Sequence, residues 1–156
     1  MRMRMTRAVA VGVGAAALGV LVTSTPAGAA TNNTERFLGI ETSATASSYP
    51  LSATGPIHAL GRDTPLTDNS DRFSFPAGSL VIRHDSTSGT NHYDPKTCTG
   101  RFTDQGTYRV LSGTGAYAHA TGHGTYNLVG YVVGCDPKKP PKAFSLILNA
   151  AGPLNL

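Results

Sequence analysis

GTYRVLSGTGAYAHATGHGTYNL, from Gly106 to Leu128, carries the clearest structural signal of this chain. Two Gly-Thr-Tyr segments flank a Gly-Thr-Gly turn and a short Ala-rich link. Glycines at a corner between two β-prone runs are typical of a β-turn-β unit and unfavourable for a helix. The stretch therefore predicts a small all-β domain, although it names no reaction.

The N-terminal segment has the three parts of a secretory signal peptide. Three arginines form a basic region, residues 8–22 are apolar and uncharged, and Ala27-Gly28-Ala29 is a small-residue cleavage pattern. The apolar run is shorter than the roughly 20 residues of a membrane-spanning helix. We therefore expect residues 1–29 to be removed and residues 30–156 to form one secreted domain with no membrane span. A retained N-terminal anchor helix is the alternative.

The net charge of the expected domain is close to neutral. The whole chain carries a formal charge of +4, but three of its 13 basic residues lie in the signal segment while all 9 acidic residues lie outside it. The local cluster of Lys138, Lys139 and Lys142 lies among prolines, as in a surface turn. Nucleic acid requires a larger basic face, so we expect no nucleic-acid partner.

Cys98 and Cys135 are the only cysteines, and each adjoins an Asp-Pro-Lys turn segment. In an exported chain such a pair favours a disulfide between neighbouring strand ends. Closing the loop between them would stabilise the fold by about 3–4 kcal/mol. A nucleophilic thiol and a two-cysteine metal site are the alternatives, but neither has a matching signature, and we expect no metal.

Short β-prone runs separated by turn-forming residues predict about seven or eight strands. The expected strands are residues 36–42, 71–75, 79–84, 96–102, 107–111, 122–133 and 142–149. Residues 57–60, inside the Ser/Thr/Pro-rich segment 43–70, are an eighth strand or part of a long loop. Ser86–Asn91 is expected to be a turn-rich gap, and Asp104–Gly106 a hairpin connection. This spacing suits a closed antiparallel barrel or a sandwich.

Alternation with a period of two assigns side chains to faces. It places Leu80, Ile82 and His84 together on one face, Tyr126 with Leu128 and Gly130, and Phe144 with Leu146 and Leu148. Several strands are apolar on both faces, which predicts a covered outer face or an oligomer interface.

The central stretch also carries a family resemblance. Gly106-Thr107-Tyr108 and the segment SGTGAYAHATG (residues 112–122) resemble the Gly-Gly-Thr-Gly-x-Phe/Tyr-x-x-Ala-x-Gly signature of the dirigent and allene oxide cyclase-like barrels. Phe73–Leu80 is similar to a strand-turn-strand of bacterial members with this secretion pattern. Ser112 replaces the first glycine of the signature, and residues 31–70 hardly share in the resemblance.

The resemblance implies an eight-stranded barrel, often trimeric, with an interior pocket for an apolar small molecule. Characterised members of the family steer cyclisation or radical coupling, so the resemblance implies no cofactor. No acidic residue or arginine of this chain matches a catalytic position of the family, and the activity is therefore not transferred.

Three residues are candidates for the pocket. His84 shares its face with Leu80 and Ile82, which predicts an inward side chain; a hydrogen-bonded core histidine is the alternative. Tyr108 and Tyr126 would offer hydroxyl groups inside a pocket or pack as ordinary aromatic residues.

Other chemical patterns are better explained by turns. Residues 113–118 fit G-x-G-x-x-A, but Gly122 and Gly124 disfavour the helix that a dinucleotide site requires. His119 and His123 would share a helical face as metal ligands, but the same glycines indicate a turn and a strand start. The acidic residues are scattered, mostly beside turns, and no G-x-S-x-G motif is present.

The sequence leaves two main hypotheses for function. In the first, a secreted barrel binds an apolar small molecule in its lumen and guides its cyclisation or coupling; an enzyme of this kind would be a cofactor-free cyclase, isomerase or dirigent-type protein. In the second, a non-catalytic extracellular barrel acts through its surface on the cell envelope or a protein partner. Hydrolysis is a weaker third. A wide apolar cavity that ends in His84 or a tyrosine would favour the first hypothesis, and a filled barrel the second.

Overall fold

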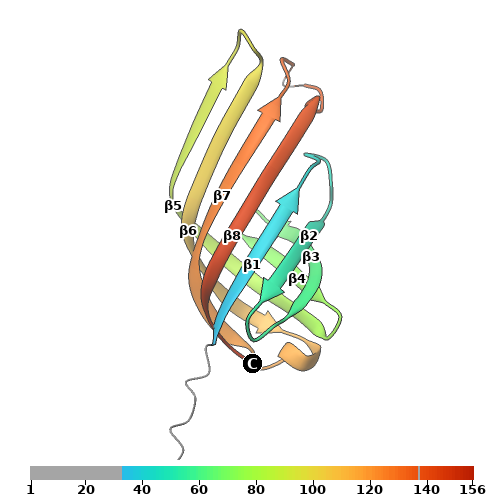
Figure 1. Cartoon of the computed structure of the whole chain (residues 1–156), viewed down its shortest axis with the longest axis vertical. Coiled ribbons are helices and arrows are strands. Elements are labelled where there is room, and N and C mark those ends of the chain that lie inside the picture. The colour runs from blue at the N-terminus through green and yellow to red at the C-terminus, as the bar shows by residue number, and fades with distance from the viewer. Residues whose placement is uncertain (1–32, 137) are drawn as a thin grey trace, which may run out of the picture. The chain divides into compact units, whose positions relative to one another are not determined.

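The described residues form one closed antiparallel β-barrel (Figure 1). The structure is a computed structural model that describes residues 33–136 and 138–156, and the expected signal peptide, residues 1–29, lies outside them. The elements are β1 (Thr34–Glu41), β2 (Tyr49–Thr54), β3 (Ala59–Thr67), β4 (Ser70–Phe75), β5 (Gly78–Asp94), β6 (Thr99–Gly113), the 3-10 helix η1 (Gly115–Tyr117), β7 (Thr121–Val133) and β8 (Ala143–Asn155). The prediction of an all-β barrel of about eight strands is confirmed.

Closure comes from pairing between the first and last strands. Each strand pairs with its neighbour in sequence, and β1 then pairs with β8 from Thr34↔Pro153 to Glu41↔Leu146. Because both sides of β1 are hydrogen-bonded, the barrel presents no free sheet edge along this strand. The closed part of the barrel therefore has a continuous wall of paired strands around its inward side chains.

The second half of the barrel is much taller than the first. Strands β5–β8 contain 13–17 residues each, whereas β1–β4 contain 6–9. Pairing of β4 with β5 ends at Arg83, and pairing of β1 with β8 begins at Leu146. Beyond these points β5–β8 continue as a four-stranded sheet that rises above the closed part (Figure 1), here called the projecting sheet.

The end of the barrel next to η1 is filled by its own buried side chains. Leu80 is fully buried, and Ile57 and Leu154 are each 2% exposed. Tyr117 of η1 packs edge-to-face on Phe75, with ring centroids 6.2 Å apart. The filled end leaves space only farther up the barrel, toward the projecting sheet.

Glu35 is a buried carboxylate with a structural role at this filled end. Its Oε2 accepts a hydrogen bond of 2.7 Å from the Ile57 backbone N–H, and its Oε1 accepts one from Arg36 N–H. Burial raises the pKa of Glu35, while these backbone donors act in the opposite direction. The side chain thus holds the β2–β3 turn against β1.

Two predictions of secondary structure were wrong, and one open question is answered. Within 43–70, where a strand and a loop were both open, the chain forms β2 and β3; Ile57 lies in the turn between them, and β3 begins at Ala59. Ser86–Asn91 is no gap: it belongs to β5 and pairs with β6. Asp104–Gly106 is no hairpin connection, since Asp104 pairs with Leu128 of β7 inside a continuous β6. Cross-strand pairing has overridden the turn preference of these Ser, Thr, Gly and Asp residues.

The predicted faces agree with the structure. Leu80 and Ile82 are buried, whereas the side chain of Arg83 between them and His84 is 41% exposed. Tyr126 is buried on β7 and Ala150 on β8. Alternation was a reliable guide because one face of each strand is enclosed.

A disulfide joins Cys98 to Cys135, with the two Cα atoms 4.8 Å apart. Cys98 lies in the turn between β5 and β6, and Cys135 in the loop between β7 and β8. The expected pairing is therefore present, and it links the tips of the two hairpins that form the projecting sheet (Figure 1).

Replacing both cysteines tests the contribution of this link. The double variant Cys98→Ser/Cys135→Ser is expected to lose about 3–4 kcal/mol of free energy of unfolding, because its unfolded chain is no longer cross-linked. Urea denaturation followed by circular dichroism measures the difference. Wild-type protein with its disulfide reduced is the control and should match the variant; a loss below about 1 kcal/mol would contradict the account.

Candidate functional site

A cavity of about 210 Å³ lies in the upper part of the barrel. Its apolar wall consists of Phe73, Ile82, Leu128, Leu146, Leu148 and Ala150. Its polar wall includes Glu41, Tyr49, Asp71, His84, Asp104 and Tyr126, and Tyr108 and Pro65 complete the lining. A concave, largely apolar space with a few polar groups in its lining is the usual form of a small-molecule site.

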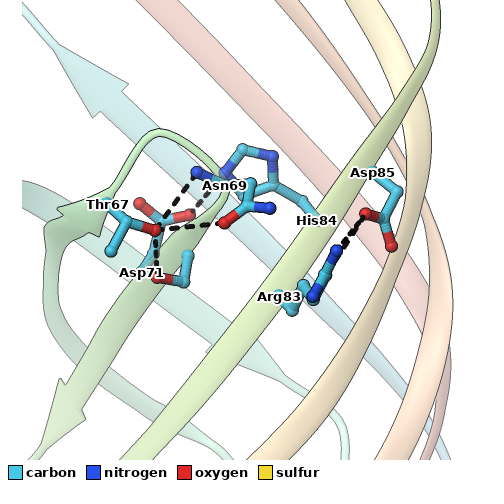
Figure 2. A network of polar contacts seen from close by, with 7 residues as sticks. Thr67, Asn69, Asp71, Arg83, His84 and Asp85 are labelled. Atoms are coloured by element: carbon cyan, nitrogen blue, oxygen red, sulfur yellow. Dashed lines mark hydrogen bonds and ion pairs between the residues drawn. The ribbon is translucent and has the colours of Figure 1, made fainter.

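His84 and Asp71 form the first polar pair of this wall. Their Nε2 and Oδ2 atoms are 3.2 Å apart, and both side chains are largely buried. The hydrogen bond to Asp71 raises the pKa of His84, and burial acts against it. Figure 2 shows the two side chains facing each other, with Arg83 and Asp85 turned away on the other side of β5.

The tip of the β3–β4 hairpin fixes the position of His84. The backbone N–H of His84 donates a 3.0 Å hydrogen bond to the carbonyl oxygen of Asn69. Thr67 Oγ1 in turn bonds to the Asn69 side chain and to Ser70 Oγ (Figure 2). The tip of the β3–β4 hairpin therefore holds the β5 backbone at His84, which fixes the point from which the imidazole extends.

Asp104 and Tyr126 form the second polar pair. The Tyr126 hydroxyl donates to Asp104 Oδ2 at 2.8 Å, and Ser86 Oγ donates to Oδ1. The Tyr126 ring also packs edge-on against the His84 ring, with centroids 5.7 Å apart. Burial first, and the adjacent Asp104 second, raise the pKa of Tyr126, so its hydroxyl stays protonated and donates.

Asp63 is the most unusual carboxyl group of the barrel. It is 0% exposed, lies opposite Tyr49 in the β2–β3 register, and faces inward with Pro65. Neither of its oxygens has a hydrogen-bond partner among the described residues, although the Tyr49 phenol lies close enough to favour the carboxylate. Burial, reinforced by the charge of Asp71, raises the pKa of Asp63 to about 7.

The three residues singled out from the sequence line the same cavity. His84 comes from β5, Tyr108 from β6 and Tyr126 from β7. Burial raises the pKa of Tyr108 to about 12. His84 combines both predicted roles, because it is a hydrogen-bonded interior histidine and also borders the cavity.

Sequence reasoning missed the gathering of carboxyl groups. The acidic residues were expected to lie mostly beside turns, but Asp63 and Asp104 lie inside strands and face inward. One signal was available: Asp71 lies two residues before Phe73 and four before Phe75, so alternation places all three on the inner face. The approach of Asp63 to Tyr49 depends on a strand, β2, that the sequence did not predict.

The remaining patterns occupy turns and strands away from the cavity. The glycine pattern of residues 113–118 is a single 3-10 turn, in which Gly115 has φ +61°, a conformation that side chains rarely adopt. His119 lies in the turn that follows, and His123 in β7. Among the described residues, no three His, Cys, Asp or Glu side chains are placed to hold a metal ion.

The apolar wall continues upward onto the projecting sheet. Phe102 and Phe144 stack with ring centroids 6.3 Å apart, on the same face as Leu128 and Leu146. They meet above Gly130, where a Cβ atom would overlap the Phe102 ring. Glycine at this position lets two aromatic rings close over the strand and extend the apolar surface beyond the cavity.

Comparisons with family models, with curated proteins and with solved structures found no match. The resemblance to the dirigent and allene oxide cyclase-like barrels therefore stays a prediction. Within the part of the chain that the structure describes, no helix is long and apolar enough to cross a membrane.

The raised pKa of Asp63 predicts a specific pH dependence of stability. A carboxyl group whose pKa rises from 3.8 to about 7 on folding stabilises the fold below pH 4, and that contribution is lost as the pH rises through 7. Asp63→Asn keeps the shape and cannot ionise. It should match wild type at pH 4 and exceed it at pH 8, on the order of a few kcal/mol.

Urea denaturation of both proteins between pH 4 and pH 8 measures this difference. Asp68→Asn, at an exposed turn position, is the matched control and should follow the wild-type curve. If Asp63→Asn were less stable than wild type at pH 8, the carboxylate would be favourably solvated and this account of the site would be wrong.

Proposed function

We propose that this protein binds a small, mainly apolar molecule in the lumen of its barrel. The observation that supports the proposal is the cavity of about 210 Å³, apolar on one wall and bordered by His84, Tyr108 and Tyr126. A barrel with a purely structural interior has no need of such a space, because filling it would stabilise the fold.

The size of the cavity limits the ligand. A compact molecule that buries about 200 Å² of apolar surface gains roughly 5 kcal/mol from the hydrophobic effect. Part of that gain offsets the entropy lost on association, so hydrogen bonds from the polar wall are needed for tight binding. A longer ligand would extend along the Phe102–Phe144 surface of the projecting sheet.

Guidance of a cyclisation or coupling is the reaction that the family resemblance implies, and it stays a prediction. Two features support it. The site would hold a reactive molecule in one conformation with less access to bulk water, and His84 would transfer a proton at Nδ1, because Asp71 occupies its Nε2. Neither requires a bound cofactor.

The same proposal places the protein outside the cell. The Cys98–Cys135 disulfide supports this location, since such bonds persist in oxidising compartments. It agrees with the signal peptide expected at residues 1–29.

The outer surface supports a second candidate, in which the barrel acts through contacts with other proteins or copies of itself. Ile40 of β1, Ile147 of β8 and Val129 of β7 are aligned in register on the outer face, and the two isoleucines are more than 40% exposed. An apolar row across three strands is suited to association. The trimer implied by the resemblance would bury such a row.

Narrowing the cavity tests the lumen proposal. Leu146→Trp places an indole in the cavity, whereas Ser145→Trp places the same group on the opposite face of β8. With N-phenyl-1-naphthylamine, a neutral fluorescent probe, Leu146→Trp should lower the affinity at least tenfold and Ser145→Trp should leave it unchanged. Equal effects of the two variants, or no binding to wild type, would refute lumen binding.

Native mass spectrometry of protein collected from the culture medium tests location and assembly together. The expected chain begins at Ala30 or Thr31, because the signal segment has been removed. Subunits should be counted before and after Ile147→Lys, a change that introduces a charge into the apolar row. A wild-type oligomer that dissociates in the variant supports association between copies through this row, and a wild-type monomer contradicts that form of the surface candidate.

A further inference from the structure

Negative charge dominates the polar wall of the cavity. Glu41, Asp71 and Asp104 line it, and Asp63 faces inward beside them. His84 is the one lining residue that can become positively charged, and no lysine or arginine is among the described residues that line the cavity. Arg72 and Arg83, the chain neighbours of this wall, lie on the outward faces of β4 and β5.

These carboxyl groups are poorly neutralised within the protein. Asp71 pairs with His84, which is a cation only when protonated, and Asp104 accepts hydrogen bonds from two neutral hydroxyl groups. Glu41 forms no ion pair with any other described residue. Asp63 is an independent sign of a missing partner, because it is fully buried, faces inward next to the lining residues, and has only the nearby neutral phenol of Tyr49 beside its oxygens among the described residues.

Aromatic rings complete the arrangement. Tyr49, Tyr108 and Tyr126 line the cavity together with Phe73. Ring faces attract cations through their quadrupole, most strongly where water is excluded. Carboxylates and aromatic faces around one space attract the same class of group, a protonated nitrogen, while a carboxylate or phosphate ligand would be repelled.

We propose that the ligand of this cavity is an organic cation, a protonated amine attached to a compact apolar body. The inference rests on the proposed function and specifies its ligand class. The apolar body contacts Phe73, Ile82 and Leu148, and the ammonium group lies toward Asp71, Asp104 and the Asp63–Tyr49 pair. The bound cation supplies the positive charge that the protein omits.

The affinity of the cavity for a cation should depend on pH. The groups that face Asp63 are Glu41 on β1, Tyr49 on β2, Asp71 on β4 and His84 on β5. As the pH rises from 5.5 to 8, Asp63 loses its proton, and the resulting negative charge strengthens the attraction for a cation. The affinity for an amine should therefore increase over this range, with release of protons to the buffer.

Three ligands with one apolar body test the proposal on the wild-type protein. Isothermal titration calorimetry at pH 8 compares 4-phenylbutylamine, 4-phenylbutanol and 4-phenylbutyrate. The amine should bind at least tenfold more tightly than the alcohol, and the carboxylate most weakly. At pH 5.5 the preference for the amine should shrink at least threefold.

Variants in which a carboxylate is replaced by a carboxamide show which residues contribute to the affinity for the amine. Asp63→Asn and Asp104→Asn should each reduce the amine affinity at least fivefold at pH 8 and leave the alcohol affinity within twofold. Asp85→Asn, on the outward face of β5, is the matched control and should change neither affinity. Thermal denaturation of each variant verifies that it is folded.

The outcomes separate the two proposals. If the alcohol or the carboxylate binds as tightly as the amine, the inference of a cationic ligand is wrong and lumen binding stands. If none of the three binds and N-phenyl-1-naphthylamine is also not bound, both proposals fail. An amine preference that persists unchanged in both carboxamide variants would place the cation elsewhere and would also overturn the inference.

Discussion

The pairing of β1 with β8 is the interaction on which the rest of the structure depends. It joins strands from opposite ends of the domain and turns a meander of hairpins into a closed wall. Without it, β1 and β8 would be the two unpaired edge strands of an open sheet. With it, the interior excludes water, and every charge inside has a higher energy than it would have at the surface.

Carboxyl groups inside the closed barrel are costly to ionise, because they are removed from water. Asp63 would be inexpensive to replace by an apolar residue, since nothing in the described part of the barrel bonds to its oxygens. Strained or unsatisfied groups of this kind concentrate at functional sites, where they are kept for what they bind. The arrangement of Asp63, Asp71 and Asp104 around an aromatic-lined space is the feature that supports the proposed cationic ligand.

Much of this fold could be predicted from the sequence because the barrel has one enclosed face. Alternation in 79–84, 122–133 and 142–149 identified the inward residues, including His84 and Tyr126, since burial imposes a strict period of two. The long strand β5 could not be predicted: Ser86–Asn91 consists of turn-forming residues that are held extended by β6. The candidate site could be predicted from the sequence only in part. Asp63 lies opposite Tyr49 because of the register between two strands in a Ser/Thr/Pro-rich segment.

The position of the disulfide has a consequence for how the cavity wall assembles. Cys98 and Cys135 enclose β6, η1 and β7 in one covalent ring, and that ring carries Asp104, Tyr108 and Tyr126. In the oxidised but denatured chain these three side chains remain tethered within a short contour length. The disulfide thus lowers the conformational entropy that is lost when these three residues come together. Pairing of β1 with β8 remains the long-range contact whose full loop-closure entropy is lost during folding.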